Sequence, residues 1–201
     1  MERTNTIRLV RPEDAEGEIA EIYEGILSGR TDALDEELAL SKLWMSLGND
    51  ADILEVVWAH TDLMYNRNPL SFDLVSMISL VVATALECEG CRYFHESALD
   101  RAGVPPEKIE QVKDLQIGGD RFTAQEAEVL HFAERAARDP YAITDDEFER
   151  LRRIGFDEAE LLAIIDCIAF HVYTAYVQAI SGIVRPGMSR EEWVNVPADD
   201  G

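Results

Sequence analysis

The residues best suited to chemistry lie in the run 87–95, which holds two of the three cysteines and one of the four histidines. In a helix, Cys88 and Cys91 are three positions apart and Cys91 and His95 are four apart, so all three side chains share one face. Two thiols at this spacing can form a disulfide. A thiol near a helix N-terminus is also favoured as the nucleophilic thiolate. The pattern predicts redox chemistry, with Cys91 as nucleophile and Cys88 as its resolving partner.

Two other interpretations of this cluster are weaker. Free cysteines also pack as small apolar side chains in a core. A zinc site would use Cys88, Cys91 and His95, but a structural zinc site takes four ligands. The sequence has no second Cys-x-x-Cys and no His-x-x-x-His. We therefore expect no metal, and the lack of a phosphate-binding glycine loop argues against flavin, nicotinamide and nucleotide cofactors.

Composition narrows the class of protein. The 201 residues include 40 acidic and 18 basic side chains, for a formal net charge of −22. This charge repels nucleic acids and anionic membranes, so neither is an expected partner. Residues 1–17 are charged and lack the apolar run of a secretion signal, which predicts a cytoplasmic protein. The uncharged run 167–184 contains His171 and Gln178, so we interpret it as a buried helix and not as a membrane span.

Periodicity predicts an all-α fold of about eight to ten helices, because apolar residues recur at helical spacing and no hairpin signal separates alternating runs. The length fits one domain, 1–201, with a core at 70–183 and an amino-terminal helical extension at 13–66. Asp50 and Thr123 are expected helix N-caps, and Thr144 opens a second capping box. The expected helices are 14–28, 38–47, 51–66, 72–86, 88–102, 107–115, 124–138, 144–155 and 158–181.

The spacing Cys88-x-x-Cys91-x-x-x-His95, on a helix between a long apolar helix and the turn 102–104, resembles the carboxymuconolactone decarboxylase superfamily. Within it, the alkylhydroperoxidase D-like (AhpD-like) branch and its longer "peroxidase-related" members are the most similar. Further similarities are Thr123–Glu126, Phe132–Glu134, Asp139-Pro140, Ile143–Asp145, 151–156 and, more weakly, 17–23. The resemblance implies an AhpD-like helical fold that assembles as trimers or hexamers, or as dimers. It also implies reduction of a hydroperoxide substrate at the expense of an external dithiol reductant.

The resemblance assigns roles by position. Cys91 attacks the peroxide, Cys88 closes the disulfide, and His95 relays a proton together with an upstream glutamate. The place of that glutamate, twelve residues before Cys88, is Ser76, whose hydroxyl can hold a water but is too weak a base.

Two nearby acids are candidates to replace the glutamate in the relay. Asp73 lies one turn before Ser76 on the same expected helix, and Glu87 is next to Cys88. Both are carboxylates, which can accept a proton.

The sequence thus predicts a thiol-dependent hydroperoxide reductase. A redox-sensing or scaffold protein of the same fold is one alternative, and a carboxymuconolactone decarboxylase-like lyase, implied by the superfamily alone, is another. Outside the cluster, we expect Cys167 to be buried and inert and His60 to be partly exposed. We expect His171 to be a satisfied core histidine, with a place in a pocket wall beside Tyr173 or Tyr176 as the alternative.

Overall fold

The computed structural model describes residues 7–30 and 40–194, which form ten α-helices, two short 3-10 helices and no strand, as the all-α prediction requires. The 3-10 helices are η1 (Pro12–Asp14) and η2 (Pro140–Ala142). The α-helices are α1 (Gly17–Arg30), α3 (Lys42–Leu47), α4 (Ala51–Asn66), α5 (Phe72–Ala85), α6 (Glu89–Arg101), α7 (Pro106–Lys113), α8 (Ala124–Arg138), α9 (Asp145–Arg153), α10 (Glu158–Ser181) and α11 (Arg190–Val194).

Helix starts follow the predicted capping residues. The Asp50 side chain accepts from the backbone N–H of Ile53 at 3.0 Å and opens α4. Thr123 and Glu126 form a reciprocal capping box at the start of α8. Glu147 reaches back to the backbone N–H of Thr144 at 2.8 Å at the start of α9. These contacts satisfy backbone donors that a helix leaves unpaired at its first turn.

Several predicted boundaries were wrong. The first helix begins at Gly17, because the three residues from Pro12 form a separate 3-10 turn. The second begins at Lys42, and Leu38 lies outside the described residues. The cysteine helix begins at Glu89, because Glu87 has a left-handed backbone (φ 55°) and Cys88 is its extended N-cap. Helix α11 was not predicted.

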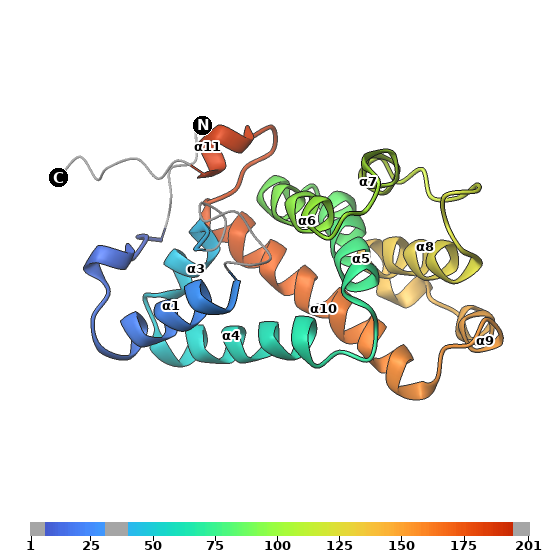
Figure 1. The fold of residues 1–201 in the computed structure, drawn as a ribbon, viewed down its shortest axis with the longest axis horizontal. Coiled ribbons are helices and arrows are strands. Elements are labelled where there is room, and N and C mark those ends of the chain that lie inside the picture. Colours follow the sequence, from blue (N-terminus) through green and yellow to red (C-terminus); the bar gives the residue numbers. More distant parts are fainter. Residues whose placement is uncertain (1–6, 31–39, 195–201) are drawn as a thin grey trace.

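The core is built around α5 and α10. Helix α10 runs through the middle of the molecule, α4 along one edge, and α8 and α9 lie at the end opposite α1 and α3 (Figure 1). Helix α5 packs against α6, α8 and α10, and ten of its fourteen residues are buried. An apolar helix with buried residues all round its circumference belongs at the centre of a fold. Helix α6 therefore packs on the α5–α10 pair through its contact with α5.

Helix α10 also has the length and hydropathy of a membrane-spanning helix. Ten of its residues are nevertheless buried within this fold, including Ile164, Cys167 and Phe170. Its apolar character is thus accounted for by packing against α5 and α8, as predicted.

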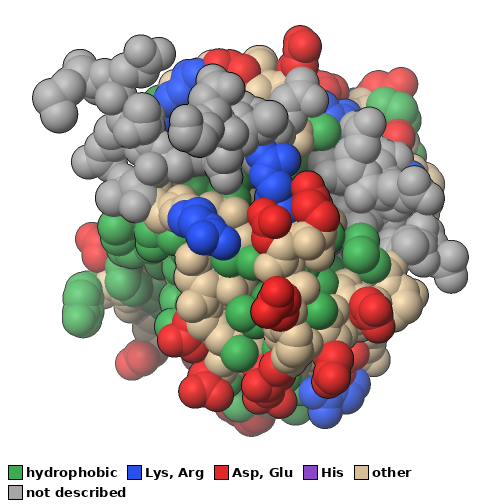
Figure 2. All heavy atoms as spheres, turned by 90° about the vertical axis from the view of Figure 1, so that its left-hand side faces the viewer, with side chains coloured by type: hydrophobic (Ala, Val, Ile, Leu, Met, Phe, Trp, Pro, Cys, Tyr) green, Lys and Arg blue, Asp and Glu red, His purple; other side chains and the backbone are tan. Residues whose placement is uncertain are grey.

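The acidic composition is visible on the surface. On the face at the α1 and α3 end, Asp and Glu side chains are spread widely and the Lys and Arg side chains stand apart from one another (Figure 2). A nucleic-acid site needs clustered cations, and the described residues visible on this face form no such cluster.

Helix α11 is held against the start of α6. Tyr93 of α6 donates to the carbonyl of Met188, just before α11, at 2.7 Å. Lys42 of α3 donates to the carbonyl of Glu192 in α11 at 2.5 Å. The Trp193 ring packs so closely on Gly90 that a Cβ built there would lie 2.3 Å from the indole nitrogen. Only glycine fits at this point of α6.

We expect Gly90→Ala to destabilise the protein by about 1–3 kcal/mol, because the added methyl group must push Trp193 and Val184 aside. Gly25→Ala is the matched control: it also lies inside a helix, its Cβ would meet its nearest neighbour at 3.7 Å, and it should gain helix propensity. Urea unfolding measures both. Equal stability of Gly90→Ala and wild type would contradict the close packing of α11.

Candidate active site

Cys88 and Cys91 form a disulfide at the start of α6, with Cα atoms 5.4 Å apart. Cys88 is the N-cap and Cys91 lies in the first turn, where the helix dipole favours an anion. The carboxylate of Glu89 in the same turn would oppose a thiolate, but it pairs with Arg92 at 3.0 Å. The helix terminus therefore keeps its preference for a thiolate at Cys91.

A cavity opens on one member of the pair only. Cys91 lines it and Cys88 does not. Most of its wall is apolar or aromatic, with Trp44, Phe94, Phe170 and Trp193 among the lining residues, and the wall contains no Lys, Arg, Asp or Glu from the described part of the chain. A molecule in this cavity would meet Cys91 first, in surroundings suited to uncharged organic groups.

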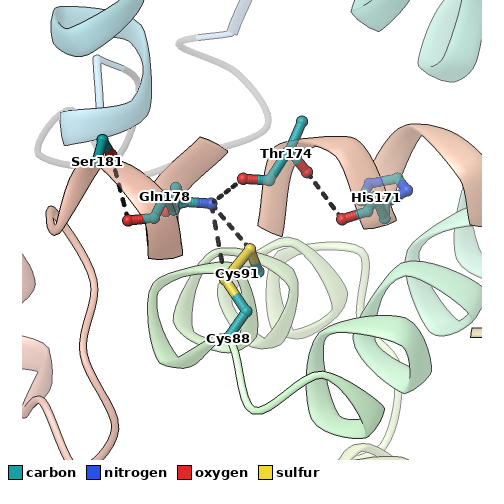
Figure 3. The surroundings of a disulfide bond; sticks show 6 residues. All are labelled: Cys88, Cys91, His171, Thr174, Gln178 and Ser181. Carbon is teal, nitrogen blue, oxygen red and sulfur yellow. Dashed lines mark hydrogen bonds between the residues drawn. A yellow bond between two sulfur atoms is a disulfide. The ribbon is translucent and has the colours of Figure 1, made fainter. Parts of the chain in front are cut away.

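Gln178 of α10 contacts the sulfur of Cys91. Its amide nitrogen donates to Sγ of Cys91 at 2.8 Å and lies 3.7 Å from Sγ of Cys88. The same nitrogen lies 3.4 Å from the backbone carbonyl of Thr174, which keeps it directed at the disulfide (Figure 3). An N–H donor stabilises negative charge, so Gln178 favours thiolate at Cys91 over Cys88.

Two buried histidines occupy the same cavity wall. His95 and His171 are only 3% and 4% exposed, and their ring centroids are 4.8 Å apart. The hydroxyl of Tyr65 lies 3.5 Å from Nδ1 of His95 and 3.5 Å from Nε2 of His171. Burial lowers the pKa of His171 to about 4, so its ring is neutral at pH 7.

The structure brings the predicted catalytic residues together but not the predicted relay substitutes. Cys91 and His95 both line the cavity. Ser76 is fully buried with an Oγ that has no hydrogen-bond partner, and it lies outside the cavity wall. Asp73 and Glu87 are exposed and also lie outside that wall. No carboxylate from the described residues faces Cys91 across the cavity.

Other residues singled out from the sequence have structural surroundings. His60 is partly exposed and pairs with Asp166 at 2.9 Å. Cys167 is fully buried, and burial raises the pKa of its thiol to about 12. Tyr173 lines a separate surface hollow, and Tyr176 is exposed. His171 is thus both a buried core histidine and part of the cavity wall, although neither tyrosine accompanies it there.

Sequence reasoning missed Gln178, Tyr65 and Trp193 as members of the site. Gln178 had a detectable signal, because it follows His171 and Thr174 at helical spacing along one face of an apolar helix. Tyr65 and Trp193 had none, since their positions depend on how α4 and α11 pack.

The residue types at the site suit thiol chemistry. Within residues 7–30 and 40–194, no group of three or more His, Cys, Asp or Glu side chains is arranged to hold a metal ion. The two cysteines of the hypothetical zinc set are joined to each other instead.

Residues 51–135 match the model of the carboxymuconolactone decarboxylase family. This segment includes α4, α5 and the cysteine helix α6. No curated protein sequence matches the chain significantly.

Solved structures share the fold at low sequence identity. An uncharacterized peroxidase-related protein from Silicibacter sp. matches with a TM-score of 0.77 at 18% identity, covering 94% of this chain and 95% of the other. A peroxidase-related protein from Ralstonia eutropha with an alkylhydroperoxidase AhpD core gives 0.73 at 18% identity, with 96% and 97% covered. The debrominase Bmp8 in complex with 2,3,4-tribromopyrrole gives 0.76 at 16% identity, with 92% of each chain covered.

We expect Gln178→Leu to slow alkylation of the reduced Cys91 by iodoacetamide at pH 7 roughly tenfold, because a hydrogen bond to a charged group contributes about 1.5–3 kcal/mol. Thr174→Val is the matched control, since its side chain lines the same cavity without donating to the sulfur. Mass spectrometry of the alkylated peptide gives the rates. Equal rates in the two variants would remove Gln178 from the site.

Burial of His171 predicts an acid-dependent loss of stability. Its pKa is lowered in the fold from 6.5 to about 4, chiefly because burial disfavours the charged ring. The hydrogen bond to the Cys167 backbone raises the pKa, His60 lowers it and Asp166 raises it. The stability of the fold that depends on a neutral His171 is therefore fully present above pH 6.5 and is lost as the pH falls towards 4.

The loss amounts to roughly 3 kcal/mol in the free energy of unfolding. His171→Gln removes the titrating group and should show a correspondingly smaller loss between pH 6.5 and 4. Urea unfolding at several pH values makes the comparison. Parallel pH profiles for the two proteins would show that His171 is not buried as a neutral ring.

Proposed function

We propose that the chain, whose residues 51–135 match the carboxymuconolactone decarboxylase family, is a thiol-dependent reductase of organic hydroperoxides. The observation that carries the proposal is the asymmetry of the cysteine pair. Cys91 lines the cavity and accepts a hydrogen bond from Gln178, whereas Cys88 is bonded to it from outside the cavity wall. A nucleophile must meet its substrate, and a resolving thiol must meet only the nucleophile.

The reaction proceeds in three balanced steps. The Cys91 thiolate attacks the terminal oxygen of the hydroperoxide, the O–O bond breaks, and the leaving alkoxide takes a proton to become an alcohol. The thiol of Cys88 then attacks the Cys91 sulfenic acid, forming the disulfide and releasing water. An external dithiol supplies two electrons and two protons to restore both thiols. His95 is the proton carrier in the first step, taking the proton of the Cys91 thiol and giving it to the alkoxide.

The cavity supports an uncharged substrate. Its described wall is mostly aromatic and aliphatic and holds no Lys or Arg, so a carboxylate or phosphate on the substrate would be buried without a cationic partner. The net charge of −22 further opposes the approach of anions. We therefore propose a neutral alkyl or aryl hydroperoxide, reduced in the cytoplasm, where dithiol reductants are maintained.

We expect Cys91→Ser to abolish consumption of cumene hydroperoxide in the presence of a dithiol, because no thiol then remains in the described cavity wall. Cys88→Ser should react once and accumulate the Cys91 sulfenic acid, which dimedone traps for mass spectrometry. Normal turnover by both variants would refute the proposal. Disulfide formation in the wild type without repeated turnover would favour the redox-sensing alternative.

The two acids considered for the relay provide a further comparison within the same assay. Asp73→Asn and Glu87→Gln should keep the wild-type rate within about twofold, because both side chains lie on the surface outside the cavity. A large loss in Glu87→Gln would restore that carboxylate to the relay.

Assembly of several copies is also part of the proposal. Ile53 and Val56 on α4 and Tyr173 and Ile180 on α10 are exposed apolar residues, and three of them line one surface hollow. Burying this face against a second copy removes apolar area from water.

We expect Val56→Glu and Ile180→Glu to lower the molar mass measured by light scattering after gel filtration, since each puts a charge on the proposed contact. Tyr141→Glu is the control, because Tyr141 is 98% exposed on the separate element η2. A monomeric wild type, or a mass unchanged in both α4 and α10 variants, would contradict assembly through this face.

A further inference from the structure

The two cavity histidines are linked by a tyrosine. The Tyr65 hydroxyl lies between Nδ1 of His95 and Nε2 of His171, at 3.5 Å from each. The three side chains come from α4, α6 and α10, so three helices converge on this point. The order of donors and acceptors along the chain decides which nitrogen of His95 can act as a base.

The proton on His171 is fixed by two neighbours. Nδ1 of His171 lies 2.8 Å from the backbone carbonyl of Cys167, which can only accept a hydrogen bond. It also lies 3.3 Å from Oγ of Ser79, whose hydrogen is already donated to the carbonyl of Val75 at 2.7 Å. Both neighbours therefore require a hydrogen on Nδ1. Because the ring is neutral, Nε2 of His171 is an acceptor.

The direction of the remaining bonds follows from this tautomer. The Tyr65 hydroxyl donates its single hydrogen to Nε2 of His171, so towards His95 its oxygen accepts. Nδ1 of His95 must then carry a hydrogen, and its Nε2 holds the lone pair. A base in a cavity needs its lone pair on a defined nitrogen, as the orienting residue of a catalytic triad ensures for its histidine.

We propose that Tyr65 and His171 are positioning residues that hold His95 in its Nδ1–H tautomer, so that Nε2 of His95 takes the proton of Cys91. This inference rests on the proposed function for its last step and on the structure for the rest. Tyr65 and His171, both neutral, would thus orient His95 in place of an acidic relay residue. Ser76, at the position expected for that acid, does not line the cavity.

His171 keeps one protonation state between pH 6 and 8. His171 is buried and neutral down to about pH 4. The titratable groups that act on it are His60 from α4 and Asp166 from α10, and these pair with each other at 2.9 Å. Nε2 of His171 therefore remains an acceptor for the Tyr65 hydroxyl throughout this range.

Long-range proton–nitrogen correlation NMR on the reduced, histidine-labelled full chain at pH 7 reads the tautomers directly. We expect both His95 and His171 to be Nδ1–H forms. In Tyr65→Phe, which retains the ring packed at 5.7 Å from Phe72, His171 should keep its tautomer and His95 should turn to the Nε2–H form. Tyr141→Phe, which alters an exposed tyrosine, should leave the tautomers of both histidines unchanged.

The rate of sulfenic acid formation supplies a second readout. Tyr65→Phe should slow the reaction of reduced Cys91 with cumene hydroperoxide by roughly 10- to 100-fold, while its urea midpoint stays near that of the wild type. An Nε2–H form of His171 in the wild type would overturn the proposal. An unchanged His95 tautomer together with an unchanged rate in Tyr65→Phe would do so as well.

The proposed function and the proposed orientation of His95 can be refuted independently. A wild type that shows the expected tautomers but does not reduce hydroperoxide would refute the function and leave the orientation of His95 supported. A wild type that reduces hydroperoxide with His95 in the Nε2–H form would refute the relay and leave the function standing.

Discussion

The contact between the Gln178 amide on α10 and the Cys91 sulfur on α6 joins two buried helices at the point where the cavity begins. It depends on the α5–α10 core, because α6 packs on α5 and α10 lies against the same helix. Gly90 contributes by its missing side chain, which lets Trp193 close over the first turn of α6. The position of the Cys91 sulfur is therefore a property of the whole helical core and not of the cysteine motif alone.

The local electrostatics at Cys91 favour a thiolate, although the chain as a whole is strongly negative. A protein with a net charge of −22 is a poor environment for a thiolate. Local terms dominate because they act over a few ångströms: the dipole of α6, the N–H of Gln178 and the pairing of Glu89 with Arg92. Screening by salt weakens the distant surface charges and leaves these contacts nearly intact. A debrominase has a similar fold, so the fold alone does not specify a substrate.

Much of the fold was accessible from the sequence, because capping residues and apolar periodicity are local signals. Thr123 and Asp50 open helices where predicted, and the apolar helix α5 is central. The start of the cysteine helix was misplaced by one residue, since α5 ends in a left-handed C-terminal turn at Glu87, where the sequence lacks the glycine that usually marks such a turn. It nevertheless leaves Cys88 and Cys91 close enough to bond.

The site was less accessible, because its walls come from helices far apart in the chain. The polar face of α10 was a readable signal for Gln178, whereas nothing in the sequence places Tyr65 beside two histidines. The one measurement closest to the central claim is the product analysis after mixing fully reduced protein with one equivalent of cumene hydroperoxide. The account predicts one alcohol formed for each Cys88–Cys91 disulfide, with Cys167 still a thiol. Intact hydroperoxide and two free thiols at Cys88 and Cys91 would contradict it.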